Sequence, residues 1–176
     1  MVAAMPDSPP DTPPAYPVNA AHLVRTAVLA QLQLSAMADH KASILMGATF
    51  VIFTIAVGHA QGSDAPLPLL VLGAAAFFSA VFAVLAVVPA TRAAKGAPLN
   101  LMFFGSFTQL SEEEYLDRLT EQLRTDDSIY RTMAHEIYQN GRVLAFKKYR
   151  LLGWAYRIFL AGLVASFLAY LAEYFG

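Results

Sequence analysis

The stretch SAMADHKASILMGATFVIF, residues 35–53, places Asp39, His40 and Lys41 directly before an apolar run. That run extends over residues 42–57 and contains no Asp, Glu, Lys or Arg. The triplet is either a catalytic or metal-binding cluster or the point where a helix passes from water into lipid. A basic residue at that point is expected, because Lys and Arg are enriched at the cytoplasmic ends of membrane spans. We favour the membrane boundary and keep a sensor pocket at the triplet as the alternative.

The composition is typical of a membrane protein. Hydrophobic residues make up 57% of the 176 residues and charged residues only 14%, whereas soluble domains carry about 25% charged residues. Two further runs, residues 67–88 and 158–171, also contain no charged side chain. Because a helix needs roughly 20 apolar residues to cross a bilayer, we predict transmembrane helices at residues 42–59, 68–89 and 152–172.

The basic residues predict the orientation of these spans. All 12 Lys and Arg precede the first span, lie between the second and the third, or lie at the start of the third. Arg157 lies inside the third span, and we expect its side chain to snorkel to the interface. The positive-inside rule places the amino terminus and residues 90–150 in the cytoplasm and the hairpin of residues 58–66 outside. Residues 1–18 are rich in proline and are expected to form a disordered tail.

The first span is predicted to continue a cytoplasmic helix of residues 19–41. Apolar residues recur there at spacings of three and four, the period of one helix face. They are Leu23, Ala27, Ala30, Leu34 and Met37. Nothing in the sequence breaks a helix before Gly47, so we predict one helix that runs from the cytoplasm into the membrane.

Residues 90–150 are predicted to form a helical sensor region. Arg92 and Lys95 are expected to anchor the second span, and residues 100–104, NLMFF, fit a short strand or an extended segment. A capping box is predicted where Ser111 accepts from the amide of Glu114 and the Glu114 carboxylate reaches back. The carboxylates that follow, up to residue 127, fit a solvated helix face.

A second cytoplasmic helix is predicted at residues 127–150. Six apolar residues at helical spacing should be buried on it: Ile129, Tyr130, Met133, Ile137, Tyr138 and Leu144. The pair Asn140-Gly141 is a turn signal and predicts a kink or a functional irregularity. The expected fold is an all-α membrane protein in which three transmembrane helices are continuous with a small cytoplasmic helical bundle.

Small residues at spacing four offer two interpretations. They allow helices to approach closely in lipid, either within the trio of spans or between protomers of a homo-oligomer. The residues are Ser43 and Gly47, then Ala75, Ser79 and Ala83, then Gly162 and Ser166.

Several kinds of chemistry find no support in the residues. The chain has no Cys and only four His, which is too few for a convincing metal site. No nucleophile elbow and no phosphate-binding glycine loop is present. We therefore predict that the protein is not an enzyme and needs no cofactor. A net charge of −1 gives no reason to expect a nucleic-acid polymer as partner.

The basic cluster before the third span also has two interpretations. Its members are Arg142, Lys147, Lys148 and Arg150. They either anchor the span to anionic headgroups, or an arginine clamps a phosphate while Tyr130, Tyr138 or Phe104 stacks on a base. The first interpretation is favoured by the residues alone.

Three segments taken together resemble a known family. They are AMADHKASILMGATFVIF at 36–53, LMFFGSFTQLSEEEYLDRL at 101–119 and MAHEIYQNGRVLAFKKYRLLGWAYRIFLAGL at 133–163. In this order and spacing they look like the transmembrane effectors of Pycsar antiphage systems, over about residues 20–172. The resemblance implies a bacterial inner-membrane protein that acts with an adjacent pyrimidine cyclase. The cyclase makes cyclic UMP or cyclic CMP on infection, and the effector then impairs the membrane, so that the cell dies before the phage spreads.

Which residues bind the nucleotide is not carried by the resemblance. From their chemistry and position we predict Asp39, Lys41, Tyr138, Arg142 and Tyr149 as ligand-binding residues. The competing functions are a constitutive membrane anchor or scaffold, marked by an exposed apolar patch on the helices of residues 111–138, and a membrane enzyme, which would need a polar pocket.

Overall fold

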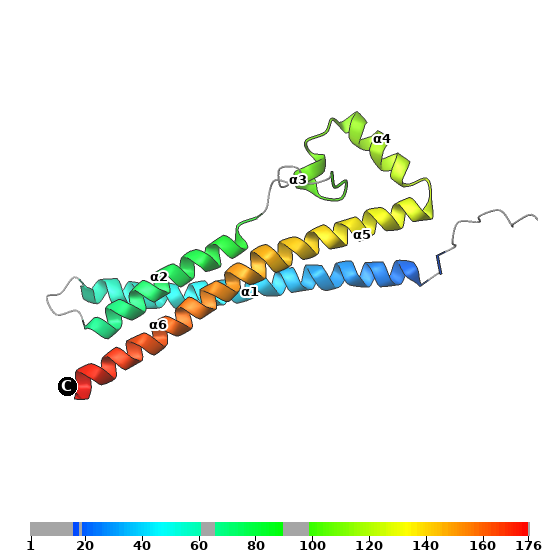
Figure 1. The fold of residues 1–176 in the computed structure, drawn as a ribbon. Coiled ribbons are helices and arrows are strands. Elements are labelled where there is room, and N and C mark those ends of the chain that lie inside the picture. Colours follow the sequence, from blue (N-terminus) through cyan, green and yellow to red (C-terminus); the bar gives the residue numbers. More distant parts are fainter. Residues whose placement is uncertain (1–15, 18, 61–65, 90–98, 176) are drawn as a thin grey trace, which may run out of the picture.

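The computed structural model describes residues 16–17, 19–60, 66–89 and 99–175, and their regular structure is entirely helical. The molecule is elongated (Figure 1): three long helices lie side by side at one end, and the shorter helices lie at the other. The predicted tail and the tip of the predicted hairpin lie almost wholly outside the described residues, and so do Arg92 and Lys95.

Helix α1, Ala20–Ala60, is one unbroken helix of 41 residues. At 1.5 Å per residue it is about 60 Å long, roughly twice the thickness of a bilayer core. The prediction that the first span continues the preceding helix is therefore confirmed. Three helices in the described residues are long and apolar enough to cross a membrane: α1, α2 and the continuous helix Asp126–Phe175.

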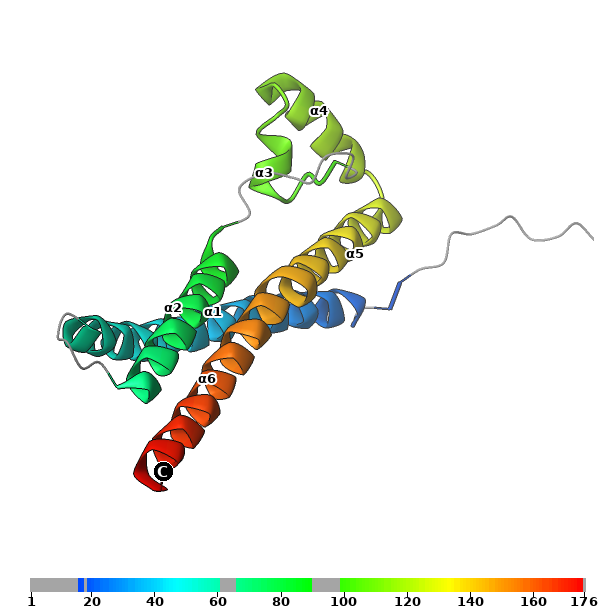
Figure 2. The ribbon, with the colours of Figure 1, turned by 60° about the vertical axis from the view of Figure 1, so that its left-hand side comes forward.

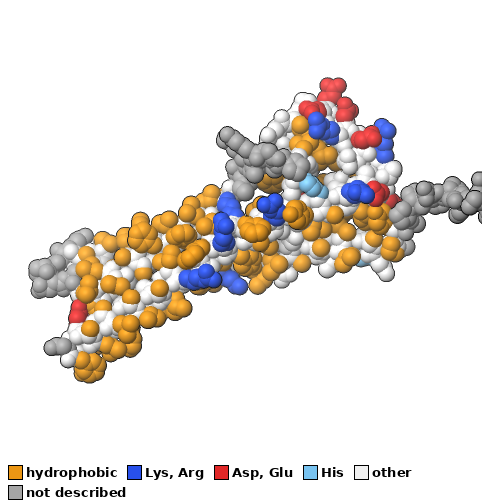
Figure 3. Space-filling model, viewed as in Figure 1, with side chains coloured by type: hydrophobic (Ala, Val, Ile, Leu, Met, Phe, Trp, Pro, Cys, Tyr) orange, Lys and Arg blue, Asp and Glu red, His pale blue; other side chains and the backbone are white. Residues whose placement is uncertain are grey.

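We name the two ends of the molecule by their composition. The apolar half comprises residues 42–60, 67–87 and 151–175, and the charged half comprises residues 20–41 and 99–150. A belt of Lys and Arg side chains lies midway along the molecule, where the two halves meet (Figure 3).

In the apolar half, α2 (Leu67–Val87) packs between α1 and α6 (Arg150–Phe175). A Cβ added to Gly162 would lie 2.0 Å from the Cβ of Ala75, and one added to Gly73 would lie 2.4 Å from that of Ala56. Only glycine allows these helices to approach so closely. The hydroxyl of Ser79 donates to the carbonyl of Ala155 at 2.8 Å.

The small residues of the second and third spans thus pack within one chain. Ser79 and Ala83 are fully buried, and Ser166 donates to the carbonyl of Pro68 at 2.7 Å. Gly47 of the first span differs, since an added Cβ would meet nothing within 4 Å. Of the two interpretations of these residues, packing within the trio holds for α2 and α6.

The charged half adds α3 (Phe104–Phe107), α4 (Glu112–Gln122) and α5 (Asp126–Val143) to the first half of α1. Both ribbon views place α3 and α4 beside α5 and away from α1 (Figures 1 and 2). The strand predicted at residues 100–104 is wrong: the segment forms a turn that leads into α3. Its apolar residues have no neighbouring strand among the described residues with which to pair.

Helix α4 begins as predicted at Ser111, whose side chain accepts from the amide of Glu114 at 3.2 Å. The second bond of the predicted capping box is not formed among the described residues. Glu114 Oε1 instead accepts from Arg118 Nη2 at 2.6 Å. One turn further along the helix, a guanidinium competes successfully for that carboxylate.

The helix of residues 126–175 changes its pitch once. Residues Leu144–Tyr149 form a π-helix, η1, between α5 and α6. Asn140 and Gly141 are regular α-helix, so the predicted irregularity lies a few residues further on. Gly141 lies close to α1 instead, since an added Cβ would lie 3.2 Å from Gln31 Nε2.

The predicted burial of one face of α5 is wrong. None of its residues is fully buried, and Tyr138 is 64% exposed. The other five residues predicted as buried are half-buried. Helix α5 lies against α1 on one side and α4 touches it near its start, so its apolar face is only partly covered.

Candidate functional site

A cleft of about 710 Å³ lies between α4, α5 and the segment that precedes α3. Pockets for small molecules are typically ~300–1,000 Å³, so this cleft has the size for a mononucleotide. Its lining combines two arginines, a histidine and two amides with two leucines and two carboxylates. The residues are Leu99, Asn100, Leu101, Asp117, Arg118, Glu121, Gln122, Arg131, Thr132 and His135.

Asn100 fixes one wall of the cleft to α5. Its side chain is buried at 3% exposure and uses both ends of its amide. Nδ2 donates to Glu136 Oε2 at 2.5 Å and to Gln139 Oε1 at 2.8 Å. Oδ1 accepts from the amides of Met102 at 2.9 Å and Phe103 at 3.2 Å. A single side chain thereby closes the turn before α3 and attaches it to the helix beneath.

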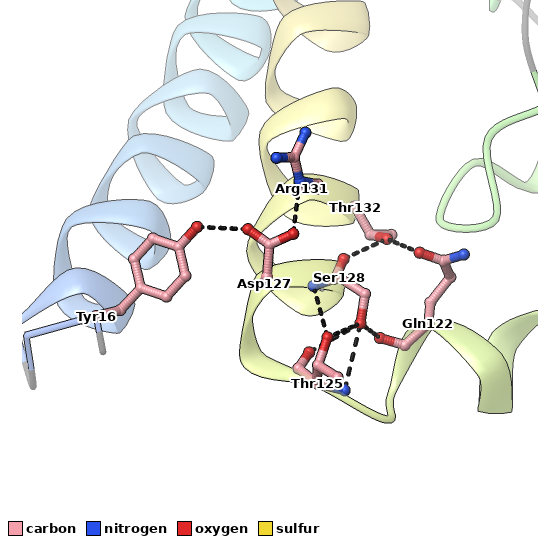
Figure 4. Close-up of polar contacts among 7 residues, drawn as sticks. All are labelled: Tyr16, Gln122, Thr125, Asp127, Ser128, Arg131 and Thr132. Carbon is pink, nitrogen blue, oxygen red and sulfur yellow. Dashed lines mark hydrogen bonds and ion pairs between the residues drawn. The ribbon is translucent and has the colours of Figure 1, made fainter. Parts of the chain in front are cut away.

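The turn between α4 and α5 fixes two of the lining residues, Gln122 and Thr132 (Figure 4). Thr125 caps α5 by accepting from the amide of Ser128 at 3.2 Å. The Ser128 hydroxyl donates to the carbonyl of Gln122 at 2.6 Å, and Thr132 Oγ1 donates to Gln122 Oε1 at 3.2 Å. The polar ends of Gln122 and Thr132 are therefore held on the cleft wall.

Arg131 is oriented by an acidic neighbour. Asp127 Oδ2 accepts from Arg131 Nε at 2.7 Å, and Asp127 Oδ1 accepts from Tyr16 Oη at 2.7 Å (Figure 4). The bond from Tyr16, followed by the bond from Arg131, lowers the pKa of Asp127. The bond to Asp127 raises the pKa of Tyr16 and also that of Arg131. Asp127 therefore stays ionised and Arg131 stays charged.

The two arginines are cationic side chains of the cleft, whose lining also includes the carboxylates of Asp117 and Glu121. Arg118 is paired with Glu114 through Nη2, and Arg131 is paired with Asp127 through Nε. In Arg131 this leaves the two terminal nitrogens without a hydrogen bond among the described residues. Two parallel N–H groups of a guanidinium match the oxygens of a phosphate. Such a group can bind an anion while its Nε remains held.

A second polar cluster lies at the belt between the two halves. Lys148 of η1 donates to Asp39 Oδ1 at 2.8 Å, to Asp39 Oδ2 at 2.7 Å and to Ser35 Oγ at 2.8 Å. The Lys148 side chain is only 18% exposed and that of Asp39 is 40% exposed. All three hydrogens of the ammonium therefore have acceptors on α1, so this cluster fastens the π-helix to α1.

Two further bonds attach η1 to its surroundings. Tyr149 Oη donates to the carbonyl of Leu34 on α1 at 3.2 Å. Lys147 Nζ donates to the carbonyl of Val88, just past the end of α2, at 2.8 Å. The π-helix is thus bonded to both neighbouring helices at the level of the basic belt.

The structure does not gather the five residues predicted to bind a ligand. Asp39 and Tyr149 lie at the belt, where protein groups already satisfy them. Lys41 is exposed there, and its carbonyl accepts from Tyr156 Oη at 3.3 Å. The triplet of the opening stretch thus lies where the two halves meet, and its assignment to the membrane boundary stays a prediction.

The other two lie on α5 away from the cleft. Tyr138 is 64% exposed, and the guanidinium of Arg142 lies 5.9 Å from the ring centre of Phe146. None of the five predicted residues lines the cleft. Their assignment to a ligand stays a prediction.

Sequence reasoning missed the residues that do line the cleft. Arg118 and Arg131 each follow an acidic residue by four positions, and this spacing made the whole acidic stretch resemble a solvated face. The two arginines differ from an ordinary surface pair only because the segment before α3 lies beside them and encloses a cleft. Asn100 carries no sequence signal at all, since its role depends on contacts with α5.

The described residues contain no group of three or more His, Asp or Glu side chains that could hold a metal ion. The candidate site is the cleft lined by Arg118 and Arg131. Of the lining residues, His135 is the one nearest to η1. It precedes η1 by nine residues, which corresponds to about 14 Å along the helix.

Comparisons with known proteins give one match. A family model described as Pycsar effector protein domain matches residues 22–173. No curated protein and no solved structure matches the chain.

Proposed function

The chain belongs to the Pycsar effector family, which makes it an effector of antiphage defence, and on that premise we propose that a cyclic pyrimidine nucleotide activates it. The nucleotide is cyclic UMP or cyclic CMP, produced by a cyclase encoded alongside. The activated protein impairs the inner membrane and causes abortive infection. It is inserted with the amino terminus and the charged half in the cytoplasm, as the distribution of Lys and Arg favours.

One observation carries this proposal: the helix that forms a wall of the cleft is the helix that enters the membrane. Helix α5 continues through η1 into α6 without a break over Asp126–Phe175. A ligand that moves α5 therefore acts on a transmembrane helix through continuous backbone.

The lining of the cleft supports a nucleotide as the ligand. Arg131 and Arg118 offer guanidinium groups to the single negative charge of a cyclic phosphate. Gln122 and Asn100 bring amide groups, which pair with the donors and acceptors of a pyrimidine edge. Leu99 and Leu101 supply apolar surface for the ring.

The π-helix supports a change of state between the cleft and the membrane. A single π turn within an α-helix often lies at a functional site. A ligand shifts such an equilibrium only by binding one state more tightly. Moving it from 1:99 to 99:1 requires about 5.5 kcal/mol of differential affinity for the two states.

Calorimetry of the detergent-solubilised full chain with cyclic UMP and cyclic CMP tests the proposal. We expect saturable binding of one of them, lost in Arg131→Gln and retained in Arg124→Gln. Arg124 is the control, because it lies in the short connection between α4 and α5, pairs with Glu121 at 3.0 Å and does not itself line the cleft.

Two results would count against this site. Binding that survives Arg131→Gln and Arg118→Gln but fails in Arg142→Gln would move the ligand to the residues predicted from sequence. Absence of binding by both nucleotides to the folded protein would remove the proposed activation.

A second function is favoured by a specific observation. Leu116 and Leu123 of α4 are 49% and 57% exposed, and Tyr138 of α5 is 64% exposed. This exposed apolar surface is the mark expected of a membrane anchor that holds a partner protein. Such a scaffold gives no response to either nucleotide, so the calorimetric experiment separates the two functions.

A further inference from the structure

The part of α1 in the charged half carries a heptad pattern. Apolar residues follow one another in steps of four and three residues: Leu23, Ala27, Ala30, Leu34 and Met37. Lys41 and Ile44 continue the same steps at the membrane boundary. This alternation places the residues on one seam along a helix and is the spacing of a coiled coil. We call these five apolar residues the α1 seam.

Four of the five residues of the α1 seam are exposed in the single chain, and Ala27 is half-buried. Leu23 is 73% exposed, and Leu34 and Met37 are each 43% exposed. Helix α1 meets α5 and η1 through a different face, where Gln31 donates to the carbonyl of Ile137 at 2.9 Å and Asp39 accepts from Lys148. Tyr149 Oη also reaches the carbonyl of Leu34 at 3.2 Å, but the side chains of Leu34 and Met37 stay exposed.

Lipid does not cover the seam either. Met37 and Leu23 precede Lys41 by 4 and 18 residues, which corresponds to about 6 and 27 Å along the helix axis. The seam thus extends from the basic belt away from the apolar half. Leucines exposed outside the apolar half can be buried only against a protein surface.

We propose that the α1 seam pairs with the α1 seam of a second copy of this chain, as a parallel coiled coil. Membrane anchoring favours this occupant, because two copies inserted alike present the same residues at the same height and in the same direction. The flanking residues on the open side include Thr26 and Gln33, which are uncharged, so identical helices meet there without repulsion.

Two properties of the seam fit self-association. Ala27 and Ala30 allow the two helices to approach closely at its centre. Lys41 occupies a core position of the heptad, and a lone lysine in that position selects register and oligomeric state at a cost in stability. Beyond Lys41, the same face continues into the apolar half with exposed Ile44 and Val51. The proposed contact is therefore continuous with a free face of the first span.

Disulfide cross-linking in native membranes tests the proposal. The chain contains no Cys, so a single substitution gives one thiol per protomer. Leu34→Cys and Met37→Cys should form disulfide-linked dimers on mild oxidation, since facing seam positions allow the short Cα separation that a disulfide requires. Ala36→Cys is the matched control, exposed and at the same height but off the seam, and it should form no disulfide-linked dimer.

A second measurement uses the full chain in detergent, with the oligomeric state determined by mass. Leu34→Asp places two like charges opposite each other and should weaken the dimer about tenfold or more, whereas Ala36→Asp should leave it unchanged. Circular dichroism checks that both variants stay helical. Three results would each overturn the proposal: equal cross-linking at residues 34 and 36, a monomer at all concentrations, or a cross-link to a different protein. These readouts need no nucleotide, so they are independent of the proposed activation.

Discussion

The two halves of the molecule are held together in different ways. In the apolar half, glycine, alanine and serine bring α2 and α6 into contact so close that added atoms have no room, and buried hydroxyls bond to the neighbouring backbone. In the charged half, neither α4 nor α5 has a fully buried residue. The apolar half is therefore built as one rigid unit. The charged half depends on a few polar contacts, which makes it the part that a ligand can rearrange.

The largest effect is expected at the closest contact of the apolar half. Gly162→Ala places a Cβ where that of Ala75 already lies, so α2 and α6 must separate. Overpacking of this kind costs about 1–3 kcal/mol or more, and thermal unfolding in detergent should show a clear loss of stability. Gly47→Ala is the control, because its added Cβ meets nothing within 4 Å. Equal stability of the two variants would mean that this contact does not make the apolar half more rigid than the charged half.

A smaller and local effect is expected at Asn100. Asn100→Ala removes a buried side chain that bonds both to α5 and to the turn before α3, and buried groups left unpaired cost about 1–3 kcal/mol. We expect faster hydrogen exchange in residues 99–107 and weaker nucleotide binding, with the apolar half unchanged. Thr108→Ala, whose hydroxyl bonds only to Phe104 of its own turn, should leave both properties as they are. Slow hydrogen exchange in residues 99–107 of Asn100→Ala would show that the Asn100 amide does not hold the cleft wall in place.

The belt between the halves should respond to the loss of Lys148. Lys148→Met leaves Asp39 without its cation. Because this pair is only partly exposed, we expect a cost of about 1–2 kcal/mol, between the values for surface and buried pairs. Hydrogen exchange should rise in η1. The double variant Asp39→Asn with Lys148→Met should recover part of the loss, whereas Lys147→Met should have a lesser effect. An equal effect of the two lysine variants would contradict the role assigned to the cluster.

The smallest effect is a pH dependence at the far end of the charged half. The pKa of Asp127 lies below its ordinary value of 3.8, so the stability from this contact is present at neutral pH and is lost as the pH falls through the lowered pKa. The pKa of Tyr16 lies above its ordinary value of 10.0, so the contact is also lost as the pH rises through the raised pKa.

Limited proteolysis near residue 20 should therefore be slowest between these two limits. Tyr16→Phe should make cleavage faster at neutral pH and remove the alkaline limb. Tyr138→Phe serves as the control, since Tyr138 is largely exposed. A pH profile that Tyr16→Phe leaves unchanged would exclude the contact as its cause.

The sequence predicted the apolar half better than the charged half, and the reason is physical. Runs without charge and the period of α1 depend on local composition, so three long apolar helices and the continuity of α1 were predictable. The burial of α5 was not, because it depends on how many helices surround it. The position of the irregularity was missed by a few residues: Asn140-Gly141 is a turn signal in isolation, but its small size serves a close contact with Gln31.

The candidate site was the least predictable part. Residues with obvious chemistry near the membrane, such as Asp39 and Tyr149, form bonds within the protein. The cleft is lined by Arg118 and Arg131, whose spacing from acidic neighbours resembles that of ordinary surface pairs. Its remaining wall comes from a segment that sequence reasoning interpreted as a short strand or an extended segment.

Release of a dye from liposomes that contain the purified full chain tests most directly whether the charged half controls the membrane. With cyclic UMP or cyclic CMP present on both sides of the bilayer, we predict release that depends on one nucleotide, fails in Arg131→Gln and persists in Arg124→Gln. Release that is the same with and without nucleotide, or that is the same in the two variants, would contradict the account.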